Sequence, residues 1–143
     1  MISNYQGSTT SVVTIVNRRA IYRLGDLQLR IMKILWERRE ATVSQVFEEL
    51  HKQSSLAYTT VSTMLRKMEA RGLITHRAEG RSFLYRARVA EEVVSRSMVD
   101  HLVDRIFEGR LIDVVNHLLT TREVSRDELK SLERLIEEKK KGK

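Results

Sequence analysis

The segment 58-YTTVSTMLRKMEARG-72 combines short hydroxyl side chains and bases at a spacing typical of one helix. Its apolar residues recur every three or four positions and form one stripe about 100° wide: Val61, Met64, Leu65 and Met68. The opposite side carries Thr59, Thr63 and Arg66, flanked by Thr60, Ser62 and Lys67. Hydroxyl groups can donate to or accept from base edges, and an arginine can bind guanine or phosphate. The pattern therefore predicts a recognition helix that enters the major groove of DNA with its N-terminal turns.

The segment after this helix predicts a basic hairpin. LITHRA and SFLYRARV are short β-prone runs on either side of Glu79-Gly80, and the second run alternates apolar and polar residues. Four arginines surround the expected turn: Arg77, Arg81, Arg86 and Arg88. Arginines in this position can contact phosphates beside the groove, which sets the register and affinity of binding without specifying a base sequence.

The excess of positive charge is concentrated in the same part of the chain. Of the net charge of +7, residues 56–88 contribute +5, from seven bases and two acids, whereas residues 89–143 contribute −1. A local excess of this kind is the footprint of a surface that binds a polyanion. The acid-rich C-terminal part is expected to stay away from DNA.

Three helices are expected to position this surface. The first runs from Asp26, whose carboxylate can cap it, to about Arg38. The second begins at Thr42, whose spacing to Gln45 matches a capping box. The third is the recognition helix, and Gly72 stands where a left-handed residue would end it. Three helices followed by a hairpin are the element order of a winged helix-turn-helix.

The chain after Glu91 is expected to be helical again, with a break at Gly109 and a new start at Ser125, whose spacing to Glu128 matches a capping box. Its apolar stripes hold more large side chains than an appendage can hide, and burying each is worth about 1.5–3 kcal/mol. We therefore predict that this region forms a homodimer, although it can instead fold back on the winged domain. The candidate dimerisation residues are Val94, Met98, Leu102, Ile106, Leu111, Val115, Leu118, Leu119, Leu132 and Ile136.

The predicted fold is mostly α with a small β-hairpin, and it has three parts. Residues 1–22 are expected to form a flexible arm, with a short strand near Val12–Val16. Residues 23–89 form the winged helix-turn-helix domain, and residues 90–143 form the helical dimerisation domain.

Several function classes are not expected. The chain has no cysteine, so a disulfide, a thiolate metal site and a cysteine nucleophile are excluded, and a reducing cytoplasmic setting is permitted. No apolar run approaches the roughly 18 residues that a membrane span needs, and no signal peptide is expected. The four histidines are scattered outside any catalytic motif, so we expect neither an enzyme nor a cofactor. His101 and His117, with Asp104 or Asp113, are the alternative: a metal site across a dimer rather than surface or interface histidines.

The stretches LGDLQLRIMKILWERREATVSQVFEEL, AYTTVSTMLRKMEARGLI and EGRSFLYR resemble the penicillinase-repressor family of winged-helix repressors, and the likeness extends over about residues 24–140. The resemblance implies a homodimer with intertwined C-terminal helices and winged domains that bind a palindromic operator in double-stranded DNA. It also implies a bacterial, cytoplasmic, nucleoid-associated protein that controls a resistance or stress operon such as β-lactamase genes.

The resemblance also implies roles for single residues. The groove-facing positions would be Tyr58, Thr59, Thr60, Ser62 and Thr63, with Arg66 and Lys67 nearer the DNA backbone and Arg81 at the wing. Relatives commonly carry a serine-proline pair where this chain has Ala57-Tyr58, so the start of the recognition helix differs.

The family's induction route is a further implication. In antibiotic-responsive members a membrane sensor protease triggers cleavage of an Asn-Phe bond in the dimerisation region, and the matching bond here joins Asn116 to His117. The copper-responsive branch uses a cysteine cluster near its C-terminus, which this chain lacks.

The main alternative function is a winged-helix module for protein–protein assembly, whose bases would serve an acidic partner. The two readings differ in one observable. DNA binding should depend steeply on salt and should prefer one short palindrome over random duplex.

Overall fold

The computed structural model describes residues 22–142, which fall into two compact units, 22–100 and 101–142. The strand expected at Val12–Val16 lies outside the described residues. The division falls inside helix α5 (Glu91–Ile106), because Val94 in the first half of that helix belongs to the core of the first unit.

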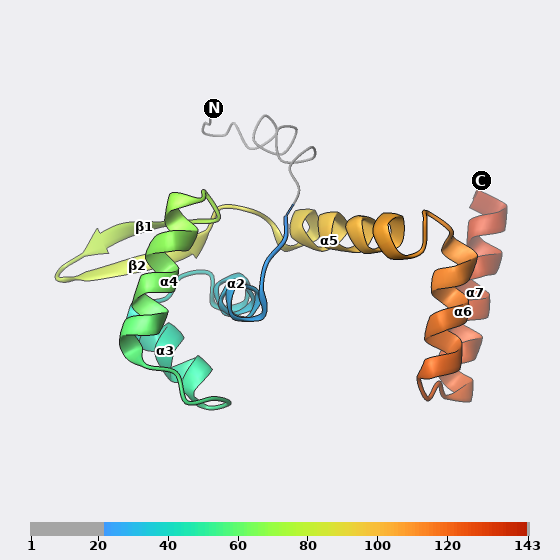
Figure 1. The fold of residues 1–143 in the computed structure, drawn as a ribbon, viewed down its shortest axis with the longest axis horizontal. Helices are drawn as coiled ribbons and strands as arrows, with labels where there is room; N and C mark the ends of the chain where they lie inside the picture. The colour runs from blue at the N-terminus through green and yellow to red at the C-terminus, as the bar shows by residue number, and fades with distance from the viewer. Residues whose placement is uncertain (1–21, 143) are drawn as a thin grey trace. The chain divides into compact units, whose positions relative to one another are not determined.

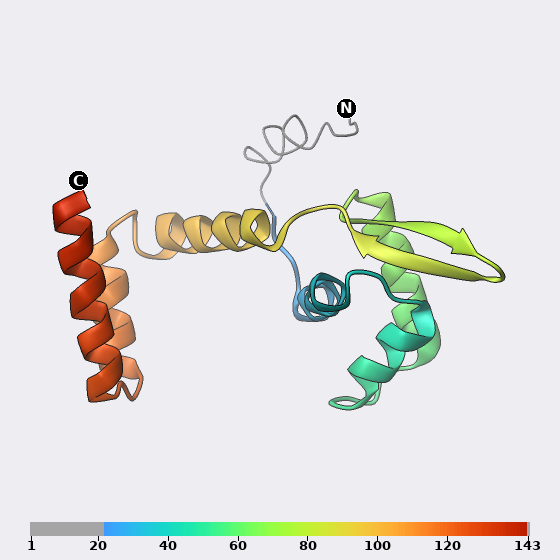
Figure 2. The same cartoon turned by 180° about the vertical axis from the view of Figure 1, so that it is seen from behind.

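The first unit contains three helices and a hairpin, in the order predicted for a winged helix-turn-helix (Figure 1). Its elements are α2 (Asp26–Arg38), α3 (Val43–His51), α4 (Tyr58–Ala70), β1 (Ile74–Glu79) and β2 (Ser82–Ala87). Helix α2 packs on α3 and on β2, and α4 packs on α3 and on β1. The tip of the hairpin projects beyond α4 in both views (Figures 1 and 2).

The core of the first unit is made of the apolar stripes of these elements. Val61, Leu65 and Met68 of α4 are fully buried, and Met64 is half-buried at the edge of the stripe. The other buried side chains are Leu24, Ile31, Met32, Leu35, Ala41, Val46, Leu50, Leu73, Ile74, Tyr85, Val89 and Val94. Among the described residues this core contains no buried charged side chain, so polar groups are left to the surface.

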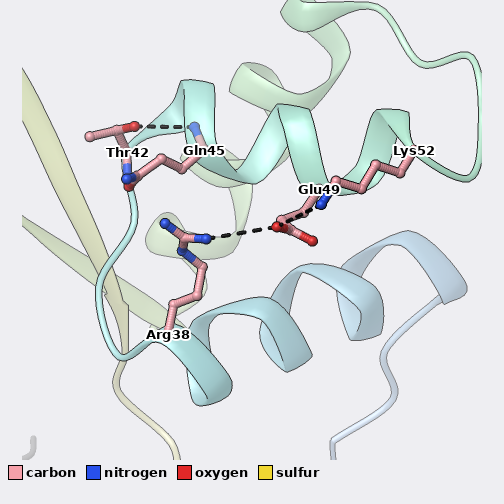
Figure 3. Close-up of polar contacts among 5 residues, drawn as sticks. All are labelled: Arg38, Thr42, Gln45, Glu49 and Lys52. Atoms are coloured by element: carbon pink, nitrogen blue, oxygen red, sulfur yellow. Dashed lines mark hydrogen bonds and ion pairs between the residues drawn. The ribbon is translucent and has the colours of Figure 1, made fainter.

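The start of α3 confirms the predicted capping box (Figure 3). The backbone N–H of Gln45 donates to Thr42 Oγ1 at 3.1 Å, and the backbone N–H of Thr42 donates to Gln45 Oε1 at 2.9 Å. Two otherwise unpaired backbone donors are thereby satisfied. In the same region Glu49 lies 3.7 Å from Arg38 at the end of α2 and 3.3 Å from Lys52 just after α3, so these bases are partly neutralised.

The cap expected from Asp26 is wrong. Gly25 occupies the cap position, and its N–H donates to the side chain of Gln28 at 3.2 Å, while Asp26 is already the first helical residue. A carboxylate at the first helical position still interacts favourably with the positive end of the helix dipole.

The end of α4 confirms the role predicted for Gly72, which has a φ of 82°. The Leu73 N–H donates to the Met68 carbonyl and the Gly72 N–H donates to the Glu69 carbonyl, each at 3.0 Å. These two bonds form a Schellman motif, in which the left-handed residue lets the chain reverse. The reversal leads directly from the recognition helix into β1.

The hairpin pairs Glu79 with Ser82, so its two-residue turn is Gly80-Arg81. The sequence placed the turn one residue too early, at Glu79-Gly80. Gly80 has a φ of 63° and takes the first central position, which is where type II′ turns need glycine. Ala41 adds an unpredicted third strand position, exchanging backbone hydrogen bonds of 2.8 and 3.0 Å with Tyr85.

Two polar contacts fix β1 relative to the helical part of the unit. Arg77 donates to both carboxylate oxygens of Glu40, at 2.9 and 3.0 Å. His76 Nδ1 lies 2.7 and 2.9 Å from the two carboxylate oxygens of Glu69 in α4. The hydrogen bond and positive charge of Arg77 lower the pKa of Glu40.

The second unit is helical, as predicted. Helix α5 ends at Ile106, and the residues with positive φ, Glu108 and Gly109, separate it from α6 (Leu111–Thr121). Helix α7 (Arg126–Gly142) follows, and Ser125 Oγ accepts from the Glu128 N–H at 3.1 Å, which is the N-terminal hydroxyl cap of the predicted capping box. None of residues 101–142 is fully buried.

The capping box predicts a measurable loss when its hydroxyl is removed. Thr42→Ala should lower the free energy of unfolding by about 1 kcal/mol, because the Gln45 N–H loses its acceptor. Ser44→Ala, at an exposed position of the same helix, should change it by less than about 0.5 kcal/mol. Urea unfolding followed by circular dichroism measures both, and equal effects would contradict the assigned cap.

The Glu40–Arg77 pair predicts a pH-dependent difference in stability. Because the folded-state pKa of Glu40 is lowered, its contribution is present near neutral pH and disappears as the carboxyl group is protonated at acidic pH. The melting temperature of Glu40→Gln should therefore fall below that of the wild type at pH 7, and the two should converge as the pH falls below the ordinary pKa of a glutamate and then through the lowered pKa of Glu40.

The control is Glu37→Gln, since Glu37 is exposed and makes no ion pair among residues 22–142. Thermal unfolding at low salt should give this variant a constant offset from the wild type across the pH range. A Glu40→Gln curve of the same form would show that the pair contributes nothing.

Candidate nucleic-acid interface

The structure places the polar residues of α4 on one outward face. Tyr58 is 46% exposed, and Thr59, Thr60, Arg66 and Lys67 are also exposed. Ser62 and Thr63 are half-buried. The hydroxyl groups therefore belong to the first two turns of the helix, and the two bases follow in the third.

Arg66 does not extend freely into solvent. Its Nη1 donates to Ser62 Oγ at 3.0 Å and its Nη2 donates to Thr63 Oγ1 at 3.3 Å. Since these partners lie one turn earlier, the guanidinium is drawn toward the N-terminal half of α4. The hydroxyl groups accept in these bonds and keep their own hydrogens available for an outside acceptor.

An aromatic contact that the sequence analysis missed supports the start of α4. The rings of Phe47 and Tyr58 meet edge to face with centroids 5.5 Å apart, and Phe47 stacks on His51 at 5.2 Å. The spacing of Phe47 and His51, four residues apart on α3, signals the second contact. No local pattern signals the first, because it depends on how α3 and α4 pack.

The arginines of the hairpin differ in how free they are. Arg81 is exposed in the turn itself, at the projecting tip seen in Figures 1 and 2. Arg77 was expected to reach a phosphate, but two of its donors bond to the carboxylate of Glu40, and Glu79 lies 3.7 Å away, so its positive charge is balanced within the unit. Arg86 and Arg88 are exposed and form no ion pair among the described residues.

The electrostatic surface follows from this pairing. The two acids of the segment 56–88 both have partners within the unit, since Glu69 contacts the His76 ring and Glu79 lies 3.7 Å from Arg77. Six bases of the same segment form no ion pair among residues 22–142: Arg66, Lys67, Arg71, Arg81, Arg86 and Arg88. The local positive excess is therefore carried by side chains that can meet an external anion.

The residues expected to form a dimer differ in how deeply they are buried within the single chain. Val94 is 1% exposed in the core of the first unit, and Met98 packs against that core. Val115 and Leu132 are half-buried in the second unit. The remaining six are at least 40% exposed: Leu102, Ile106, Leu111, Leu118, Leu119 and Ile136. The second unit thus leaves an apolar surface uncovered within one chain.

The Asn116-His117 peptide bond lies inside α6. Besides helical backbone bonds, the Asn116 carbonyl accepts from Thr120 Oγ1 at 2.8 Å, and the His117 carbonyl accepts from Thr121 Oγ1 at 2.7 Å. The His117 ring contacts Phe107 edge to face, with centroids 5.7 Å apart.

Residues 22–142 contain neither a metal-binding cluster within the single chain nor a membrane-spanning helix. No group of three histidine, aspartate or glutamate side chains there is arranged to hold a metal ion within the single chain. No helix of this part of the chain has both the length and the apolar character to cross a membrane.

Comparison with known proteins shows similarity to a family of repressors. The family model described as Penicillinase repressor matches residues 24–138. The transcriptional regulator BlaI of Mycobacterium tuberculosis is 34% identical over 122 residues, covering 84% of this chain and 87% of that protein. The penicillinase repressor of Bacillus licheniformis is 28% identical over 122 residues, covering 85% and 95%.

A solution structure of the monomeric form of Bacillus licheniformis BlaI with the blaP half-operator is 31% identical and covers 52% of this chain and 90% of that one, with a TM-score of 0.46. Since the family model spans nearly all described residues and a relative is 34% identical over 84% of the chain, the chain belongs to the penicillinase repressor family.

Proposed function

We propose that this chain is a sequence-specific transcriptional repressor that lays α4 in the major groove and sets the hairpin beside it on the DNA backbone. The observation that carries the proposal is the outward face of α4, where hydroxyl groups and unpaired bases gather without a single carboxylate. Membership of a family of penicillinase repressors supports the same function. Phosphate contacts from Lys67 and Arg81 would supply affinity, and contacts from the first turns of α4 would supply discrimination.

The repressor is proposed to act as a homodimer. The exposed apolar side chains of α5, α6 and α7 would cost a single chain much free energy if they remained in water. A two-fold pair of chains would bury them and would present two α4 helices to an inverted repeat, with half-sites about 10 base pairs or a multiple apart.

The regulated genes are proposed to form a resistance or stress operon, such as one encoding a β-lactamase. The name of the Bacillus licheniformis relative, a penicillinase repressor, supports this class of target. The protein would work on the bacterial chromosome in the cytoplasm, and a membrane sensor protease system that leads to cleavage between Asn116 and His117 is the proposed route of release.

The DNA-binding proposal is tested by separating affinity from discrimination. The preferred inverted repeat is first selected from a pool of randomised duplexes, and binding is then measured by fluorescence anisotropy over a range of salt concentrations. Lys67→Ala should weaken binding to every duplex and reduce the salt slope by about one. Thr60→Ala should cost about fivefold or more on the preferred repeat and much less on random duplex.

Lys33→Ala serves as the matched control, because Lys33 is an exposed lysine of α2 outside the proposed interface. It should leave both affinity and salt slope unchanged. A flat salt dependence with no enriched repeat would instead favour a winged-helix module that binds an acidic protein.

The dimer is tested by placing a charge on the apolar surface of α6. Leu118→Glu should raise the dimer dissociation constant about 100-fold or more, since a two-fold interface loses the buried leucine twice at about 1.5–3 kcal/mol each. Asn116→Glu, on an exposed polar position of the same helix, should change it little. Sedimentation equilibrium measures both, and a wild-type chain that stays monomeric at micromolar concentration would refute the dimer.

A further inference from the structure

We propose that Arg66 reads a guanine in the major groove, and that Ser62 and Thr63 are positioning residues that hold its guanidinium for this contact. The inference deepens the proposed function and rests on it, because it requires α4 to lie in the groove. It departs from the sequence-based expectation that Arg66 lies nearer the DNA backbone and that both hydroxyl groups meet bases themselves.

The Arg66 side chain extends toward the N-terminal half of α4. Its two terminal nitrogens contact residues three and four positions earlier, at 3.3 and 3.0 Å. The charged group therefore lies over the second turn of α4, although the residue belongs to the third. In a recognition helix the N-terminal turns approach the base edges, so the guanidinium is held where bases are read.

Arg66 forms no ion pair with a carboxylate among the described residues. Glu69, three residues later, is in the usual position for an ion pair along a helix. Both of its oxygens instead lie within 2.9 Å of His76 Nδ1 on β1. Because β1 occupies this acid, Arg66 is left to bond with neutral hydroxyl groups and keeps its full charge for an external acceptor.

The chemistry of the cluster identifies the ligand. A guanidinium has five N–H donors, and two are used by Ser62 and Thr63. No hydrogen bond or ion pair among the described residues uses the remaining donors or the two hydroxyl hydrogens. Guanine offers two acceptors, N7 and O6, on its major-groove edge, and arginine matches them with a bidentate contact.

Holding the side chain also favours discrimination over general attraction. A free arginine can swing to whichever phosphate is nearest, whereas one fixed by two hydrogen bonds loses less conformational freedom when it meets a base. Lys67 provides the contrast within the same helix, because its side chain is exposed and makes no hydrogen bond or ion pair among the described residues.

The experiment uses the full chain and duplexes with a randomised core of about 30 base pairs, long enough for two half-sites. Selection with the wild type should enrich an inverted repeat with a guanine in each half-site. Arg66→Ala should reduce the preference for that guanine about 5- to 150-fold and leave the other positions of the repeat unchanged. The double variant Ser62→Ala, Thr63→Val should reduce the same preference by a smaller factor, and Lys67→Ala should not alter it.

A second measurement identifies the atoms. Replacing the selected guanine by 7-deazaguanine removes the N7 acceptor, which should weaken wild-type binding and leave Arg66→Ala binding unchanged. Circular dichroism should show that each variant is folded, since Arg66 is exposed.

Three results would overturn the inference. Equal weakening of binding to all duplexes by Arg66→Ala, with a salt slope reduced by about one, would assign Arg66 to a phosphate contact. Additive losses from 7-deazaguanine and Arg66→Ala would assign the guanine to another residue, and a selected repeat without a common guanine would remove the ligand. If the wild type enriches no repeat, the proposed function itself fails. The selection with the wild type gives that result without any variant, so the two failures are distinguishable.

Discussion

The burial of one stripe of α4 is the constraint on which the rest of the interface depends. Val61, Leu65 and Met68 are completely withdrawn from water, so the helix cannot rotate about its axis without exposing them. Every polar side chain of α4 then has a fixed direction, and the hydroxyl groups and bases are held outward together. The Schellman turn at Gly72 extends this constraint to the hairpin, because it fixes where β1 leaves the helix.

Charge pairing divides the first unit into an inert part and an available part. Glu49 of α3 lies between Arg38 of α2 and Lys52, and Glu40, in the loop between α2 and α3, accepts two hydrogen bonds from Arg77 of β1. The bases of α4 and of the hairpin turn form no ion pair among residues 22–142, so their charge is available where DNA is proposed to bind. Surface ion pairs contribute little to stability, and their effect here is to neutralise part of the positive charge elsewhere on the unit.

Local patterns predicted the elements well, and contacts between distant segments limited the detail. The capping box at Thr42, the glycine at the end of α4 and the breaks near Gly109 and Ser125 depend on near neighbours, and all were foreseen. The bridge between Ala41 and Tyr85 and the loss of Arg77 to Glu40 depend on residues about 40 positions apart. Within the site, periodicity placed the outward residues of α4, but only the folded chain shows Glu69 engaged by His76.

The helical state of the Asn116-His117 bond has a kinetic consequence. Proteases bind their substrates as extended strands, so a bond wound into α6 is hidden from them until that turn unwinds. The hydroxyl groups of Thr120 and Thr121 also bond to the two carbonyls, so unwinding this turn breaks these contacts as well as the backbone hydrogen bonds. If a protease removes the repressor by cleaving this bond, the rate of local unfolding of α6 limits the rate of cleavage, and the catalytic rate of the protease does not.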